Sequence, residues 1–299
     1  MIIPHLNEPE DLRRCLAALD EQRIDGIPFE IIVVDNGSRE LPAALCASFK
    51  GVRLERELTP GPGPARNRGV EVARGELLAF IDADCFAQPG WVASIVGYMA
   101  SHPHISFLGG DIRIAPADPA ALTAIEAYES VYSYRMQSYV EREGFAASGN
   151  MAVRRHVFRL VGGFGGISSM EDTEWGKRAT RMGYRIAYLP QARVVTPSCR
   201  SFAELARRWD RHVAHEYRNL DDKPVSRMRW LLRSAVMAAS PVGEVLRVLR
   251  SDRVRGLRQR WLAFTVVARV RLYRARRMIE LLLRDNTTGM LDMWNRESR

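Results

Sequence analysis

The chain has 299 residues, of which 46% are hydrophobic and 26% are charged, with 44 Lys and Arg against 35 Asp and Glu. These values exclude a disordered polymer, a collagen-like fibre and a small domain stapled by disulfides. The length predicts one large domain or a domain with an appendage.

The cysteine pattern and the hydropathy of the chain indicate a cytoplasmic protein. The four cysteines are widely spaced and form no CxxC pair, which predicts reduced thiols in a cytoplasmic protein. No signal peptide opens the chain. No run of about 18 apolar residues occurs, so we expect no membrane-spanning helix.

Positive charge is concentrated at one end of the chain. From Arg200 onward there are 23 Lys and Arg against 11 Asp and Glu, whereas the first 199 residues hold 21 against 24. Nearly all of the positive side chains are Arg. A slightly acidic body with a basic tail predicts a polyanionic partner for the tail.

The first half of the chain alternates strand and helix patterns. Apolar runs predict strands at Ile2-Ile3, 29–34, 52–54 and 77–81, and helical spacing predicts helices near 8–19, 41–49 and 65–73. Strands that are apolar throughout and alternate with helices indicate an α/β fold. We expect a mostly parallel sheet covered by helices on both faces.

The second half is more helical. Residues 116–144 form an aromatic-rich helical segment, 148–153 fit a strand, and 162–166 are a glycine loop before a helix near Glu171. From residue 201 to 220, large apolar side chains recur at intervals of three and four, which predicts an amphipathic helix.

Three polar clusters follow predicted strands, at residues 5–8, 35–38 and 82–84. In open parallel sheets, ligands bind beyond the carboxyl ends of the strands. The clusters therefore predict a pocket at one edge of the sheet.

The third cluster is Asp82-Ala83-Asp84. Two carboxylates at a buried strand end repel each other unless a cation joins them, and a hard divalent ion bridging carboxylate and diphosphate oxygens would do so. The alternative is a carboxylate that caps the next helix. We favour metal and diphosphate binding because of the neighbouring clusters.

The loop at residues 61–69, Gly-Pro-Gly-Pro-Ala-Arg-Asn-Arg-Gly, is glycine-rich but is not a dinucleotide fingerprint, since Arg66 occupies the place of the third glycine. The helix that it opens could face an anion together with Arg66. Taken alone, the loop is better explained as an ordinary proline-rich turn.

Residues 171–174 place three carboxylates within one helical turn. Acidic groups at a helix N-terminus complement the helix dipole, which accounts for one or two of them. An acidic cluster after a glycine loop could also supply a general base on a mobile lid.

Together these motifs resemble a GT-A fold glycosyltransferase of the inverting family 2. The resemblance covers about residues 1–215 and rests on the order and spacing of seven segments: 2–8, 33–38, 63–69, 82–84, 149–155, 162–164 and 171–174. It implies a Rossmann-like nucleotide-binding sheet, a nucleotide-sugar donor and a divalent metal, Mg²⁺ or Mn²⁺.

The resemblance also implies site residues. Asp35 would accept a hydrogen bond from the base, Asp82 would lie near the ribose, and Asp84 would hold the metal against the diphosphate. Asp172 would be the general base, oriented by Glu171. The expected nucleotide-binding residues are Pro4, Asn7, Glu8, Asp35, Asn36, Arg66 and Asp82. The expected acceptor-binding residues are Gly149, Asn150, Trp175 and Arg208.

Three features depart from the family pattern. Asn36 replaces a common Asp. Thr196 stands after the final core strand, where many members have a metal-binding His, so we expect fewer protein ligands to the metal. Arg207-Arg208-Trp209 only partly matches the signature of processive synthases, so a polymer-extruding synthase is not expected.

We divide the chain into a GT-A catalytic domain at 1–220, with a donor half at 1–115 and an acceptor half at 116–220, and a basic helical extension at 221–299. Arg-rich amphipathic helices with Trp suit an anionic bilayer, so we expect a peripheral position on the cytoplasmic membrane face. The alternatives are a solvated helical cap and, without a recognition motif, nucleic-acid binding, which we do not expect.

The sequence thus predicts an inverting, metal-dependent glycosyltransferase that uses a nucleotide sugar, with UDP as the expected nucleotide, and a saccharide or lipid-linked acceptor. One alternative is a sugar nucleotidyltransferase, although residues 7–12 lack the glycine- and lysine-bearing loop it would need. The other is a catalytically weak membrane scaffold of the same fold.

Overall fold

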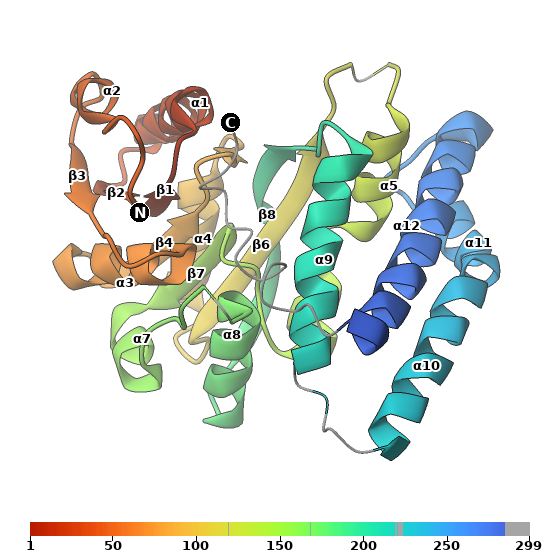
Figure 1. The fold of residues 1–299 in the computed structure, drawn as a ribbon. Helices are drawn as coiled ribbons and strands as arrows, with labels where there is room; N and C mark the ends of the chain where they lie inside the picture. The colour runs from red at the N-terminus through yellow and green to blue at the C-terminus, as the bar shows by residue number, and fades with distance from the viewer. Residues whose placement is uncertain (119, 168, 219, 221–223, 285–299) are drawn as a thin grey trace. The chain divides into compact units, whose positions relative to one another are not determined.

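The computed structural model describes residues 1–118, 120–167, 169–218, 220 and 224–284 (Figure 1). The chain forms two compact units. The first contains Met1–Arg113 and Tyr134–Thr196, and the second contains Ile114–Ser133 and the described residues from Pro197 onward. The domains predicted from the sequence were defined by what each would bind. The two compact units do not test such roles, so the predicted domain division stays a prediction. Its last part, beyond residue 284, lies outside the described residues.

The N-terminal part of the sheet is parallel. Strands β1 (Ile2–His5), β2 (Ile31–Asp35), β3 (Val52–Arg56) and β4 (Leu77–Ile81) lie in the order β3-β2-β1-β4. Helices α1 (Pro9–Glu21), α2 (Ala43–Ala47) and α3 (Pro62–Val72) connect them, which confirms the predicted alternation. Helix α3 begins earlier than predicted, because the fixed φ of proline suits the first helical turn.

Beyond β4 the sheet gains antiparallel strands. Strand β7 (Asn150–Arg154) pairs with β4 on one side and β6 (Phe107–Ala115) on the other, both antiparallel. Strands β8 (Ile186–Pro197) and β5 (Phe86–Ala87) complete the order β3-β2-β1-β4-β7-β6-β8-β5. The α/β class is confirmed, and the strand predicted at 148–153 is β7; the sequence patterns did not predict that these strands pair antiparallel.

The remaining helices of the first unit flank these strands. They are η1 (Gln22–Asp25), α4 (Trp91–Ser101), α6 (Met136–Ser138), η2 (Tyr139–Glu143), α7 (Arg155–Val161) and α8 (Glu171–Arg181). The predicted helical stretch at 116–144 is broken near Tyr134, whose φ of 49° lies in the left-handed region.

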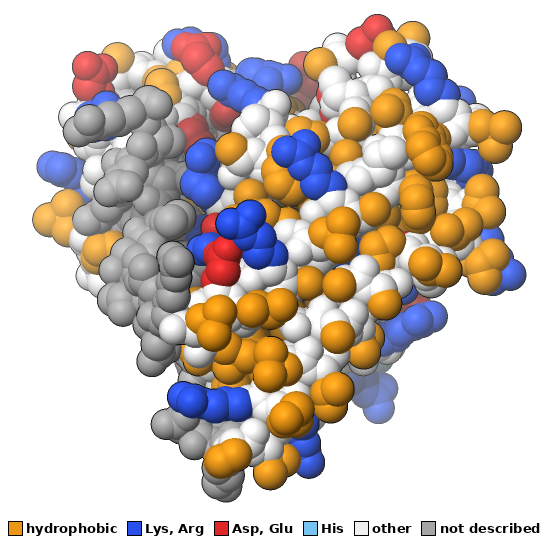
Figure 2. Space-filling view, turned by 45° about the vertical axis from the view of Figure 1, so that its right-hand side comes forward, with side chains coloured by type: hydrophobic (Ala, Val, Ile, Leu, Met, Phe, Trp, Pro, Cys, Tyr) orange, Lys and Arg blue, Asp and Glu red, His pale blue; other side chains and the backbone are white. Residues whose placement is uncertain are grey.

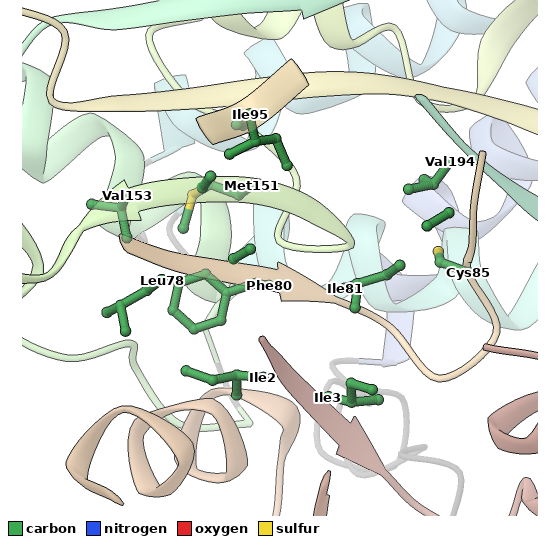
Figure 3. Close-up of a cluster of buried hydrophobic side chains, with 14 of the residues drawn as sticks. Ile2, Ile3, Leu78, Phe80, Ile81, Cys85, Ile95, Met151, Val153 and Val194 are labelled. Atoms are coloured by element: carbon green, nitrogen blue, oxygen red, sulfur yellow. The ribbon is translucent and has the colours of Figure 1, made fainter. Parts of the chain in front are cut away.

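Side chains from neighbouring strands pack together in the core of the first unit (Figure 3). Ile2 of β1, Phe80 of β4 and Met151 of β7 are all buried, and Phe80 meets the ring of Phe164 edge-on with centroids 5.3 Å apart. Burying a side chain of this size stabilises the fold by roughly 1.5–3 kcal/mol. The packing therefore gives the strand ends a rigid base.

The second unit is helical. It contains α5 (Ala124–Tyr132), α9 (Phe202–Arg218), α10 (Pro224–Ala239), α11 (Pro241–Arg250) and α12 (Gly256–Arg284). Helix α12 packs against the other four (Figure 1). The predicted amphipathic helix is confirmed as α9, whose Leu205 and Val213 are buried. No helix among the described residues has both the length and the apolar character to span a bilayer.

Candidate active site

The ends of β1 and β2 meet at one edge of the sheet. Their register pairs His5 with Asp35, and His5 Nδ1 lies 3.2 Å from Asp35 Oδ1. Both side chains are buried. Burial lowers the pKa of His5, although the hydrogen bond to Asp35 acts in the opposite direction. Asp35 also accepts hydrogen bonds from the backbone N–H groups of Gly37 and Ser38.

Two asparagines brace the loops that follow these strands. Asn7, with a left-handed φ of 58°, accepts a hydrogen bond from Arg39 N at 2.9 Å. Its own N–H donates to Ser38 Oγ, which ties the loop after β1 to the loop after β2. Asn36 is buried, and its amide bonds the backbone of Glu57, Thr59 and Gly61. Its side chain thus holds the 57–61 loop, and a contact of Asn36 with a nucleotide stays a prediction.

Arg66 of α3 links the third strand end to the acidic cluster of α8. Its guanidinium lies 2.5 Å from Asp82 Oδ1 and 3.0 Å from Glu171 Oε1. The Arg66 side chain is almost fully buried, whereas both carboxylates remain partly exposed. A buried cation needs such partners. The structure therefore brings together three predicted site residues that lie far apart in the sequence.

The carboxylates after β4 form a candidate cation site. Ligand atoms of Asp82, Asp84 and Cys85 all lie within 4.8 Å of one another, a group found by a search of the described residues. Burial, followed by the charges of Asp84 and Asp82, raises the pKa of the Cys85 thiol well above its usual range. A thiol is a poor ligand for a hard cation, so the two carboxylates are the groups that fit Mg²⁺ or Mn²⁺.

Two other positions border this carboxylate pair. Gly149 approaches Asp82 so closely that a Cβ on it would lie 2.9 Å from Asp82 Oδ2. Thr196 is buried on β8, one position beyond Val195, which pairs with Phe86. This register brings Thr196 opposite Cys85, at the edge of the candidate cation site.

Asp172 lies in the first turn of α8, beside Glu171. Burial, followed by the negative charge of Glu171, raises the pKa of Asp172 to about 6. The Thr173 N–H, which donates to Asp172 Oδ1 at 2.6 Å, and the charge of Arg66 act in the opposite direction. A carboxylate with a pKa near 6 is a stronger base than an ordinary Asp and is still ionised at neutral pH.

The glycine loop that leads to α8 is held by α3. Asn67 Nδ2 donates a hydrogen bond to the Phe164 carbonyl, and the Phe164 backbone N–H donates one to Asn67 Oδ1, each of 2.9 Å. A Cβ on Gly63 would collide with the carbonyl oxygen of Gly165. Sequence analysis assigned no role to Asn67, because nothing local indicates a partner 97 residues away. Its position directly after Arg66 was the only signal.

Two residues predicted to bind the acceptor are structural. Trp175 is completely buried, stacks on Phe158 and donates from Nε1 to the Gly162 carbonyl. Asn150 is also buried, and its amide is used by Trp91, Asp111 and Ala192. Neither side chain has surface to offer an acceptor, so these two predictions are corrected.

Arg208 belongs to the second unit. Its Nη1 lies 2.6 Å from Oε1 of Glu129, a carboxylate that is fully buried. Glu129 also accepts the backbone N–H of Cys199 at 2.7 Å. Arg208 therefore has a structural role in joining α9 to α5, and a role with the acceptor stays a prediction.

Comparisons with known proteins identify the family to which the chain belongs. The family described as "Glycosyl transferase family 2" matches residues 1–162. The glycosyltransferase AglE of Haloferax volcanii is 31% identical over 214 residues, which cover 70% of this chain and 69% of that protein.

Solved structures share the fold. The mannosyltransferase PcManGT from Pyrobaculum calidifontis, in complex with GDP-Man and Mn²⁺, has a TM-score of 0.58 at 18% identity, over 95% of this chain and 86% of that one. TarS 1–349 of S. aureus, in complex with UDP-GlcNAc, has a TM-score of 0.50 at 15% identity, over 95% and 91%. Both are GT-A glycosyltransferases. The family match spans more than half of the chain and contains the three strand-end clusters, so this protein is a glycosyltransferase of family 2.

Proposed function

We propose that the protein transfers a sugar from a nucleoside-diphosphate sugar, with UDP as the nucleotide, to a hydroxyl group of a saccharide or lipid-linked acceptor, with inversion at the anomeric carbon. The observation that carries this proposal is the Arg66 bridge, which joins Asp82 at the donor edge to Glu171 beside Asp172. Donor-binding groups and a base of raised pKa thus belong to one site. Membership of the family favours glycosyl over nucleotidyl transfer.

The donor would bind over the ends of β1, β2 and β4. Asp35, Asn7 and Glu8 would contact the donor on its base side, together with Pro4 of β1. Asn36 supports it through the 57–61 loop. One structural neighbour was solved with GDP-Man and another with UDP-GlcNAc, which supports the donor class. The choice of UDP is our proposal.

The charge of the leaving diphosphate needs compensation. Asp82 and Asp84 would hold a divalent cation, Mg²⁺ or Mn²⁺, which when bound supplies positive charge to the departing oxygen. The Mn²⁺ in the PcManGT complex supports this expectation. Arg66 adds a fixed positive charge at Asp82, and Thr196 offers a hydroxyl where a stronger ligand would stand.

Asp172 would accept the proton of the acceptor hydroxyl. As that oxygen forms its bond to C1, the bond from C1 to the diphosphate oxygen breaks, and the diphosphate leaves with the electron pair. One displacement inverts C1 and needs no covalent enzyme intermediate. Glu171, held by Arg66 at 3.0 Å, raises the basicity of Asp172 through its charge.

The substitution Asp172→Asn tests the assignment of the base. The amide cannot accept the proton, so we expect transfer to fall by about a thousandfold, while donor affinity stays within a few-fold. Donor binding is measured by thermal shift with UDP- and GDP-sugars, with and without Mn²⁺. Transfer is measured by release of the nucleoside diphosphate with alkyl glycosides as acceptors.

Glu174→Gln provides the matched control. Glu174 lies in the same helical turn and is half exposed, where it pairs with Arg178. We expect it to keep both donor binding and transfer. An equal loss of donor affinity and transfer in Asp172→Asn would contradict the role of Asp172 as the base.

We also propose a cytoplasmic location with peripheral association at the membrane face. The basic composition of the chain after Arg200 supports this partner, because anionic lipids attract Arg-rich segments. A membrane position would suit a lipid-linked acceptor.

A further inference from the structure

Helix α11 exposes most of its apolar residues and buries its acidic residue, unlike a normal surface helix. Its apolar residues Val242 and Leu246 are 81% and 61% exposed. Its acidic residue, Glu244, is buried. A surface helix of a globular protein normally turns its apolar side toward the core. Here Val248 is buried beside Glu244, but Val242, Val245, Leu246 and Leu249 are exposed, so most of the apolar side is turned toward solvent.

Buried polar contacts hold this orientation. The Glu244 carboxylate lies 2.6 Å from Arg271 of α12 and accepts a hydrogen bond from the Tyr132 hydroxyl of α5 at 3.1 Å. Arg247 of the same helix contacts it at 2.8 Å. Rotation of α11 to bury its apolar side would break these contacts and leave the Arg271 charge without its partner.

Helix α10 continues the exposed apolar surface. Val225, Met228, Leu232 and Val236 follow at intervals of three and four and are all more than half exposed. The opposite side of α10 is anchored by Trp230, which is buried and donates from Nε1 to the Met278 carbonyl at 2.9 Å. We call the exposed side chains of α10 and α11 the outer face.

The charge of the outer face has one sign. The exposed charged residues of α10 and α11 are all arginines: Arg227, Arg229, Arg233, Arg247 and Arg250. The single acidic residue of these helices is the buried Glu244. Figure 2, which turns the side bearing α10–α12 toward the viewer, shows hydrophobic side chains gathered there with Lys and Arg among them. Apolar groups mixed with arginines fit a surface that combines hydrocarbon with negative charge.

A second copy of the chain fits this face less well. A two-fold interface would set arginines such as Arg229 and Arg250 of both copies against one another, and α10 and α11 expose no acidic residue that could pair with them across it. Anionic lipid provides both components, since phosphate groups pair with Arg and the acyl boundary takes up Leu, Val and Met.

We propose that the outer face of α10 and α11 docks onto an anionic lipid bilayer, with the apolar side chains entering the acyl boundary and the arginines contacting lipid phosphates. This deepens the proposed peripheral association and rests on it. It does not depend on the donor or the reaction, because the outer face contains none of the residues assigned to the site.

Vesicle sedimentation of the full chain tests the proposal. The vesicles are phosphatidylcholine alone or mixed with phosphatidylglycerol, without nucleotide. We expect the wild type to pellet with the anionic vesicles. Leu246→Ser should weaken this binding about tenfold, since it removes a Leu that would leave water. Arg229→Gln and Arg250→Gln should each weaken it about fivefold, and added salt should reduce the difference.

Leu160→Ser is the matched control, because Leu160 of α7 in the first unit is 65% exposed, much like Leu246. It should leave vesicle binding unchanged. Thermal melting checks that each variant is folded, and thermal shift with UDP- and GDP-sugars checks the donor site independently. No pelleting of the folded wild type, equal binding by Leu246→Ser, or a wild-type dimer in sedimentation velocity that Leu246→Ser abolishes would overturn the proposal. Loss of donor binding alone would contradict the proposed function and leave the docking result intact.

Discussion

Both units bury charged side chains, but they surround them differently. In the first unit, Arg66 is buried while its partners Asp82 and Glu171 keep 37% and 20% of their side-chain surface exposed. In the pairs that Glu129 and Asp210 make in the second unit the carboxylate is the sealed member, at 0% and 9%, as is Asp111 at 0% in the first unit. The first arrangement presents acidic oxygens to solvent, and the second encloses them.

The exposure of a carboxylate decides whether it can bind a ligand or only supports the fold. A carboxylate that is partly exposed beside a buried cation can exchange its partner for a ligand, because water already reaches it. A sealed carboxylate would first have to break the packing around it. Burial of charge alone therefore does not identify the active site of this protein.

The largest effect that we expect is on stability, from the loss of an ion pair in the second unit. Arg208→Leu removes the cation from Glu129, which then keeps only neutral donors such as the Cys199 N–H. A buried charge without its counter-ion costs about 3 kcal/mol or more. We expect the free energy of unfolding in urea to fall by that amount. Arg13→Leu, which alters an exposed pair with Glu10 at 3.7 Å, should change nothing measurable.

This variant also tests the acceptor role predicted for Arg208. If Arg208 acts only through packing, the remaining folded protein should retain its transfer rate below its melting temperature. Unchanged stability with a reduced rate would reverse our interpretation and assign Arg208 to the acceptor.

The next effect is on the rate of transfer and concerns the ion pairs of Arg66 with Asp82 and Glu171. Arg66→Met removes the link between Asp82 and Glu171, and misplacement of catalytic groups by about 1 Å costs on the order of a hundredfold in rate. Since the positive charge of Arg66 lowers the pKa of Asp172, the acid limb of the pH–rate profile should also move to higher pH. Nucleoside diphosphate release across a pH series measures both changes.

Arg68→Met is the control for this substitution. Arg68 is in the same helix but pairs at the surface with Glu55 and Glu71, so we expect an unchanged rate and profile. A comparable loss in Arg68→Met would mean that α3 as a whole was disturbed.

Much of the donor edge could be predicted from the sequence, because its signals are local. Each polar cluster follows an apolar run directly, and parallel strands bring such ends together. The bridge from Arg66 to Glu171 spans 105 residues, and no periodic pattern records a contact at that distance. The antiparallel pairing of the strands after β4 was missed for the same reason, since β-pairing partners are set by tertiary packing.

Two of the four predicted acceptor residues, Trp175 and Asn150, were wrong for a different reason. Trp175 and Ala179 are buried on one side of α8, and their spacing of four was a signal that this Trp faces the core. Asn150 sits among apolar strand residues, where its partners are three groups from other segments. Similarly, the pattern of α11 predicts an amphipathic helix, but the direction of its apolar side depends on Glu244 and its contacts with α12.

The smallest effect that we expect concerns the free energy of unfolding, which the buried charge of Asp172 lowers. The pKa of Asp172 is raised from 3.8 to about 6 in the folded protein, so the folded state holds a proton that the unfolded chain releases between these pH values. Ionisation therefore destabilises the fold as pH rises from about 4, and the full cost is present above about 6. We expect Asp172→Asn to gain about 1–2 kcal/mol of unfolding free energy at pH 7, after allowance for solvent screening. At pH 3.5 the gain should vanish, because Asp172 is then protonated in both states. Urea unfolding at the two pH values measures it. A gain that persists at pH 3.5 would show that the charge of Asp172 is not its cause, and that the base owes its strength to something other than burial beside Glu171.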